Sequence, residues 1–179
     1  VIDHLARLPH GIPGDAVAGA LMAANDAIRA RARSEGIASM GATAVAALVG
    51  EGGATIFWAG DSRAYLLRGG ELTPLTRDHS VVQELVDLGR LARAEARAHP
   101  QGHVVTRAVG AAERLEVDRA ETLLGPGDRL MLCSDGLTAC VPEPQIARLL
   151  AAAARPEDTC RRLVEAALEH GAPDNVSVI

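Results

Sequence analysis

Three aspartates in this sequence stand at or just beyond the ends of segments expected to be strands. Asp61 follows the apolar segment 54–59, Asp135 follows the segment 129–133, and Asp174 lies in a Pro-Asp-Asn turn. Taken singly, each is an ordinary turn residue, because Asp-Gly and Asp-Asn dipeptides favour turns. Strands that end at an aspartate can also bring carboxylates to one edge of a sheet, where Mg²⁺ or Mn²⁺ is held by hard oxygen ligands. We therefore take these three aspartates as candidate metal ligands.

A site with two such metal ions would perform phosphoryl transfer without a protein nucleophile. The metals lower the pKa of a shared water and neutralise charge on the phosphate oxygens during in-line attack. In that chemistry the aspartates are ligands, not acids or bases. A zinc site has little support, because Cys133, Cys140 and Cys160 lack C-x-x-C spacing and no histidine pair stands at ligand spacing.

A serine hydrolase is an alternative that the same residues allow. The run Gly-Asp-Ser-Arg-Ala at 60–64 is one residue from the G-x-S-x-G nucleophile elbow, and His79 and Asp135 could complete a triad. A nucleophile elbow joins a strand to a helix, whereas segment 64–68 and the two glycines after it predict another strand and a tight turn. We expect His79 to be a structural hydrogen-bonding residue instead.

The elements that must position these residues begin with a helix. Asp15 can cap it, and Val17, Leu21, Ala24 and Ile28 fall on one face, so we expect it to cover a sheet.

Two strand pairs follow the first helix. The apolar segments 42–49 and 54–59, joined by a Glu-Gly-Gly turn, predict a hairpin whose strands are buried on both faces. Segment 64–68 turns at two glycines into segment 71–75.

A helical insert separates these strands from the next ones. Ser80-x-x-Gln83 is a capping box that begins a helix with Gly89 just past its end, and a short helix is expected before residue 100. Strands resume at 115–123 and 129–133, separated by a Gly-Pro-Gly-Asp turn, so that hairpins flank the insert.

The last part of the chain predicts two amphipathic helices, one around 146–150 and one over 160–168 that stops at Gly171. Antiparallel strands grouped between helices favour sheets covered by helices on their outer faces over a parallel βαβ alternation. The chain opens with Val1 instead of Met, and the β-branched run at 176–179 is typical of a strand cut short, so we expect a fragment.

Composition narrows the functional classes. A chain of 179 residues with 48% apolar content suits one domain over residues 1–179. The net charge is −5 and the basic residues are scattered, which argues against nucleic acid and against an anionic membrane surface. No apolar run approaches the length of about 18 residues needed to span a bilayer. A cytoplasmic soluble protein is expected.

Five motifs in order resemble a known family. They are Gly-Asp-Ser-Arg-Ala-Tyr-Leu-Leu-Arg at 60–68, Leu-Thr-Arg-Asp-His-Ser at 75–80, Thr-Arg-Ala-Val-Gly at 106–110, Gly-Asp-Arg-Leu-Met-Leu-Cys-Ser-Asp-Gly-Leu at 127–137 and Asp-Asn-Val-Ser-Val at 174–178. Their order and spacing resemble the metal-dependent protein phosphatases (PPM), the type 2C enzymes, in their bacterial form. The resemblance covers roughly residues 40–179, with 1–33 as the helical segment before it.

The resemblance implies an α+β fold, a four-layer α/β/β/α sandwich of two antiparallel sheets flanked by helices. It implies a centre of two Mn²⁺ or Mg²⁺ ions with a possible third. Asp135 and Asp174 resemble core metal ligands, Asp61 resembles the ligand of the third metal, and residues 78–105 correspond to a mobile flap that shapes access. The implied activity is hydrolysis of phosphoserine and phosphothreonine in proteins, without a phosphoenzyme intermediate, on substrates of a Ser/Thr kinase.

The sequence also departs from the family pattern. The family begins with an arginine that binds substrate phosphate and an Asp-Gly-x-Gly-Gly motif whose aspartate bridges both metals, and neither occurs here. They would lie before Val1, so we expect this fragment to be inactive by itself and its sandwich to lack strands. The alternative from another class is a phosphatase-like module that has lost activity and serves in regulation or binding.

Overall fold

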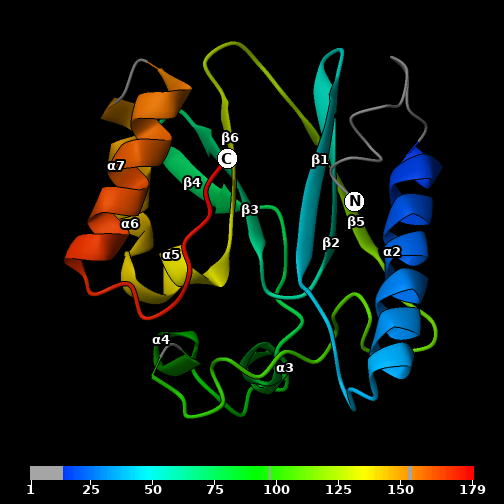
Figure 1. Cartoon of the computed structure of the whole chain (residues 1–179). Coiled ribbons are helices and arrows are strands. Elements are labelled where there is room, and N and C mark those ends of the chain that lie inside the picture. Colours follow the sequence, from blue (N-terminus) through cyan, green and yellow to red (C-terminus); the bar gives the residue numbers. More distant parts are fainter. Residues whose placement is uncertain (1–13, 97, 153–154) are drawn as a thin grey trace.

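Two antiparallel three-stranded sheets form the centre of the molecule (Figure 1). The computed structural model describes residues 14–96, 98–152 and 155–179. One sheet has the order β1-β2-β5 and the other β4-β3-β6. The strands are β1 (Ala44–Gly50), β2 (Gly53–Ala59), β3 (Arg63–Arg68), β4 (Glu71–Pro74), β5 (Asp118–Leu123) and β6 (Arg129–Cys133).

Alternate side chains of β2 show how the layers are built. Ile56 and Trp58 lie in the core between the two sheets, whereas Phe57 and Ala59 pack on the other face beneath a helix. This follows from the strand geometry, in which successive side chains point to opposite faces. Because β2 is apolar at every position from Ile56 to Ala59, it can be buried on both sides at once.

Helices cover the outer face of each sheet (Figure 1). The helix α2 (Gly14–Glu35) packs Val17 and Leu21 against the first sheet. Three helices cover the second sheet: α5 (Asp135–Cys140), α6 (Glu143–Ala152) and α7 (Pro156–Glu169). The predicted α/β/β/α sandwich is therefore confirmed.

The sheets are not assembled from neighbouring strands alone. Each starts as a hairpin, β1–β2 or β3–β4, and is completed by a later strand: β5 pairs with β2, and β6 pairs with β3. The prediction that segments 115–123 and 129–133 form a hairpin with each other is wrong, because the chain between them crosses from one sheet to the other. The prediction that both strands of the first hairpin are buried on both faces is also wrong for β1, which lies at the edge of the sheet and is half-buried to exposed.

The helical insert lies at one end of the sandwich and contains α3 (Val81–Asp87) and α4 (Arg93–Ala96) (Figure 1). Ser80 caps α3 by accepting a hydrogen bond from the backbone N–H of Gln83. The Gln83 side chain donates to Asp87 instead of returning to Ser80, so only half of the predicted capping box forms. Gly89 follows the helix with a left-handed φ of +66°, as predicted.

The two ends of the described chain compare differently with expectation. Asp15 lies inside the first turn of α2, which begins at Gly14, so it is not the capping residue. The predicted terminal strand does pair: the backbone N–H of Leu132 donates to Ile179 and that of Ile179 donates to Leu132, both at 2.9 Å. Among the residues described, no helix is long and apolar enough to cross a membrane.

Candidate active site

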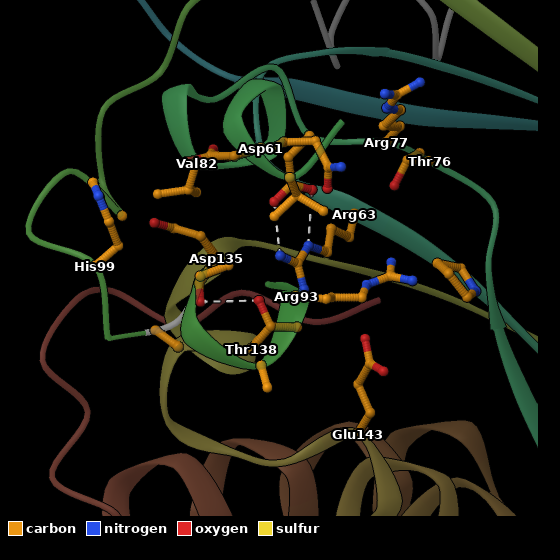
Figure 2. A pocket seen from close by; sticks show the side chains of 18 of the residues that line it. Asp61, Arg63, Thr76, Arg77, Val82, Arg93, His99, Asp135, Thr138 and Glu143 are labelled. Carbon is orange, nitrogen blue, oxygen red and sulfur yellow. Dashed lines mark hydrogen bonds and ion pairs between the residues drawn. The ribbon is translucent and has the colours of Figure 1, made fainter. Parts of the chain in front are cut away.

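A cavity of about 870 Å³ opens between the helical insert and the first turns of α5 and α6 (Figure 2). Asp61 and Asp135 both line it, and they arrive from the two different sheets, on the β2–β3 connection and directly after β6. The structure therefore brings these two of the three predicted carboxylates to one cavity.

Asp61 is held in a tight corner between β2 and β3. The preceding Gly60 has a φ of +123°, and a Cβ there would lie 2.5 Å from the Thr43 side chain, so only glycine fits. Ser62 is hydrogen-bonded to Thr43 at 2.9 Å. Asp61 itself is only 7% exposed.

The electrostatics of the corner disfavour a charged Asp61. Burial, followed by the neighbouring Asp135 carboxylate, raises the pKa of Asp61 to about 6. A buried carboxylate whose ionisation is opposed by its surroundings and by a second carboxylate is an arrangement that a divalent cation relieves.

Asp135 is the first residue of a helix that the sequence did not predict. It follows β6 and begins α5, and the next residue, Gly136, lies against the segment that carries Asp174. A Cβ at Gly136 would collide with the carbonyl oxygen of Asn175. The Asp-Gly dipeptide therefore marks a close approach of two backbones and the start of a helix, not a simple turn.

Asp174 is brought to the site by its backbone and not by its side chain. Ser134 donates to the Asn175 carbonyl at 3.2 Å and accepts from the Ser177 N–H at 3.0 Å, which fastens this segment beside Asp135. The Asp174 carboxylate is exposed, accepts a hydrogen bond from the Asn175 N–H at 2.6 Å, and does not line the cavity.

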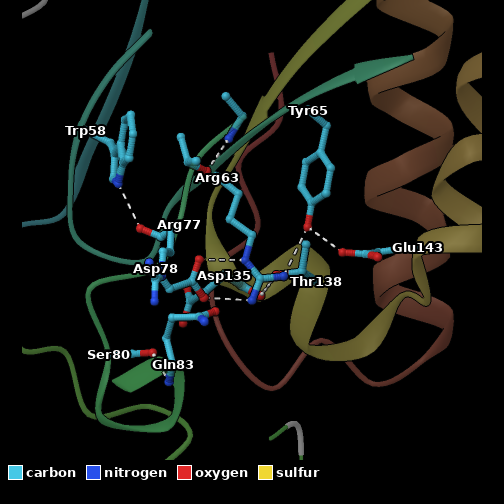
Figure 3. Close-up of polar contacts among 12 residues, drawn as sticks. Trp58, Arg63, Tyr65, Arg77, Asp78, Ser80, Gln83, Asp135, Thr138 and Glu143 are labelled. Carbon is cyan, nitrogen blue, oxygen red and sulfur yellow. Dashed lines mark hydrogen bonds and ion pairs between the residues drawn. The ribbon is translucent and has the colours of Figure 1, made fainter. Parts of the chain in front are cut away.

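A polar network that sequence reasoning missed fastens the insert to β3 (Figure 3). Arg63 donates to both oxygens of Asp78, at 2.8 and 2.7 Å, in a bidentate ion pair. Arg63 also donates to the Tyr65 hydroxyl, which in turn donates to Glu143 at the start of α6. Burial raises the pKa of Tyr65, so this hydroxyl remains a donor. The sequence feature that could have indicated this network is the spacing of Arg63 and Tyr65, which are two residues apart and so lie on one face of a strand.

The model of the family described as protein phosphatase 2C matches residues 9–176. The chain belongs to the protein phosphatase 2C family. Among curated 2C relatives, the serine/threonine protein phosphatase PstP of Mycobacterium tuberculosis is 41% identical over 100% of this chain and 35% of the relative. The serine/threonine phosphatase stp of Listeria monocytogenes is 36% identical over 78% of this chain and 56% of the relative. The chain thus spans between about a third and just over half of these proteins.

Solved 2C structures superpose closely. PppA, described as a key regulatory component of T6SS in Pseudomonas aeruginosa, has a TM-score of 0.87 at 39% identity, covering 99% of this chain and 74% of that one. The catalytic domain of PstP in complex with two manganese ions has a TM-score of 0.88 at 36% identity, with the same coverage of 99% and 74%.

The possible metal ligands of this 2C-family chain are carboxylates, which suit a hard cation, but the described residues bring too few of them together. Asp61 supplies a buried carboxylate and Asp135 a half-buried one, but within 14–96, 98–152 and 155–179 no three His, Cys, Asp or Glu side chains lie close enough to hold one metal ion together. The hydrolase alternative finds no support, because a strand follows Ser62 and its hydroxyl is paired with Thr43.

Proposed function

We propose that the protein containing this chain is a protein serine/threonine phosphatase that hydrolyses phosphoserine and phosphothreonine with bound Mn²⁺ or Mg²⁺. The observation that carries the proposal is the pair of carboxylates, Asp61 and Asp135, that face one cavity in a chain of the 2C family. The relatives are named as serine/threonine phosphatases, which supports the substrate class.

Asp135 and Asp174 would hold the two core ions, and Asp61 a third. The two manganese ions in the PstP neighbour support a centre of two core ions, and the burial and the Asp135 carboxylate that raise the pKa of Asp61 support a cation beside Asp61. Bound ions of this kind supply an activated water and neutralise phosphate charge, with no phosphoenzyme intermediate. Because the described residues bring only two of the carboxylates together, we infer that this chain by itself is a poor catalyst.

The insert at residues 78–105 would act as the flap that shapes access to the site. One side of the cavity is formed by its side chains Val82, Gln83, Val86, Arg93, His99 and His103. Arg63 and Asp78 fasten the start of the insert to β3, next to Asp61. A phosphoprotein, the product of a Ser/Thr kinase, would therefore enter between the insert and α5.

The test is metal-dependent turnover by the full-length protein. We expect hydrolysis of p-nitrophenyl phosphate and of a phosphothreonine peptide with Mn²⁺, loss of both on chelation, and recovery when Mn²⁺ is added back. Turnover that persists in excess chelator would contradict the proposal. An inactive binding module would show phosphopeptide binding without turnover under any metal, and inhibition by a serine-directed phosphonate would favour a hydrolase.

A further inference from the structure

Both ends of the helical insert meet at one histidine, which also contacts the corner that holds Asp61. The backbone N–H of His79 donates to the Gly60 carbonyl at 2.9 Å, and the Thr106 N–H donates to the His79 carbonyl at 2.8 Å. The Gly60 N–H donates back to Nδ1 of the His79 ring at 3.1 Å. One residue thus joins the entry of the insert, its exit, and the peptide before Asp61.

The far side of the ring faces an ion pair. Nε2 of His79 lies 3.2 Å from Asp118 at the start of β5, and 3.1 Å from a guanidinium nitrogen of Arg107. Arg107 itself contacts Asp118 at 2.5 Å and Glu116 at 3.5 Å. These are the charged groups that face the ring, and they come from the exit of the insert and from the β5 side of the first sheet.

Stacking and burial hold the ring in place. The His79 ring lies on Trp58 with centroids 6.2 Å apart and planes 14° apart, and the His79 side chain is only 10% exposed. The Trp58 indole N–H also donates to the Arg77 carbonyl, so the same residue of β2 holds the chain just before the insert.

The contacts determine which ring nitrogen carries the proton. Because the Gly60 N–H donates to Nδ1, that nitrogen is an acceptor, and the neutral ring carries its proton on Nε2, toward Asp118. A proton on Nδ1 would face the Gly60 N–H with no acceptor beside it, whereas a proton on Nε2 faces the Asp118 carboxylate, which also accepts from the neighbouring Arg107 nitrogen. The imidazole therefore bridges an acidic side chain and a backbone amide.

We propose that His79 is a positioning residue that sets the Gly60–Asp61 peptide and the closure of the insert together. It does not line the cavity and acts through the Gly60 N–H, in a corner where the Thr43 contact leaves the backbone little room to shift. Any displacement of the insert ends at 79 and 106 must then move or break the contact that places Asp61. The catalytic part of this inference rests on the proposed phosphatase function, whereas the coupling does not.

Two substitutions in the full-length protein separate the two ring nitrogens. His79→Asn keeps an acceptor near the position of Nδ1, whereas His79→Gln keeps a donor near Nε2 and loses the Gly60 contact. We expect amide exchange at Gly60 and Asp61 to rise about tenfold in His79→Gln and to stay near wild type in His79→Asn. His170→Gln, at the end of α7 and away from the cavity, is the matched control.

The kinetic and spectroscopic arms complete the test. We expect His79→Gln to lower kcat by about tenfold, a size typical of residues that orient ligands, and His79→Asn to restore most of it. Nitrogen-15 NMR of the wild-type ring should show the Nε2–H tautomer, a result that needs neither activity nor a folded variant. A wild-type ring protonated at Nδ1, or equal exchange at Gly60 in the Asn and Gln variants, would overturn the proposal even if the phosphatase activity is present. Absence of turnover with the expected exchange pattern would refute the function and keep the coupling.

Discussion

The corner that holds Asp61 and the segment that holds Asp174 present the same side chain in opposite ways. Asp61 is buried, and its pKa is raised to about 6. The residue before it, Gly60, has a backbone conformation and surroundings that only glycine fits. Asp174 is exposed, and its carboxylate accepts a hydrogen bond from the next backbone N–H. The sheets thus fix the position of Asp61 in advance, whereas the Asp174 carboxylate would have to turn to serve as the proposed ligand.

Asp135 shares both situations and should give the largest effect. It stands beside Asp61 in the cavity, and its neighbours Ser134 and Gly136 contact the Asp174 segment. We expect Asp135→Asn to lower Mn²⁺-dependent kcat by more than about 100-fold, beyond the loss typical of residues around a metal ligand. Asp158→Asn, on the outer helix α7, removes a carboxylate outside the cavity and should leave the rate unchanged. Equal rates for Asp135→Asn and wild type would mean that this cavity is not the active site.

Asp174→Asn sharpens the comparison, because it should affect function without affecting stability. The exposed carboxylate makes one local hydrogen bond, so its loss should change the free energy of unfolding by less than about 0.5 kcal/mol. We expect calorimetry to show weakened Mn²⁺ binding and steady-state assays to show lost turnover. A variant that binds two metal ions as tightly as wild type would mean that Asp174 never turns into the site.

How far the sequence predicts this site depends on the kind of signal. The apolar runs around Ile56 and Met131 predicted strands, and the aspartates after them predicted where the cavity would be. The pairing of β5 with β2 could not be predicted, because local patterns carry no information on which distant edge a strand completes.

The contacts of charged side chains were equally hidden. Arg63 and Asp78 are 15 residues apart, and nothing in either local sequence indicates that the Arg63 guanidinium donates to both carboxylate oxygens of Asp78. The orientation of the Asp174 carboxylate was also missed, since spacing predicts the position of a backbone and not a rotamer.

Breaking the Arg63–Asp78 pair should loosen the part of the site around Asp61, which the fold builds in advance. The two side chains are 30% and 11% exposed, so removing one leaves the other poorly solvated. We expect Arg63→Ala to lower the free energy of unfolding by about 2–3 kcal/mol in urea titrations. Arg68→Ala should cost less than Arg63→Ala, because the Arg68 side chain is 55% exposed and Asp128 keeps the hydrogen bond from the Gly125 N–H. A double-mutant cycle of Arg63→Ala with Asp78→Ala that shows no coupling would mean that the ion pair does not tether the insert.

The smallest expected effect is the one that separates Asp61 from the other two aspartates. If Asp61 holds an accessory ion as proposed, Asp61→Asn should reduce turnover only partly and keep the core metals, which calorimetry can check. The folded-state pKa of Asp61 is raised from 3.8 to about 6, so the metal-free folded protein binds more protons than the unfolded one between these values. Its contribution is therefore lost as pH rises through that range, by at most about 3 kcal/mol. Urea titrations of metal-free protein should show this fall in stability between pH 4 and pH 6, and Asp61→Asn should flatten it. If the variant keeps the full slope, the carboxylate pair in the cavity is not the source, and the repulsion that favours a cation at this corner loses its support.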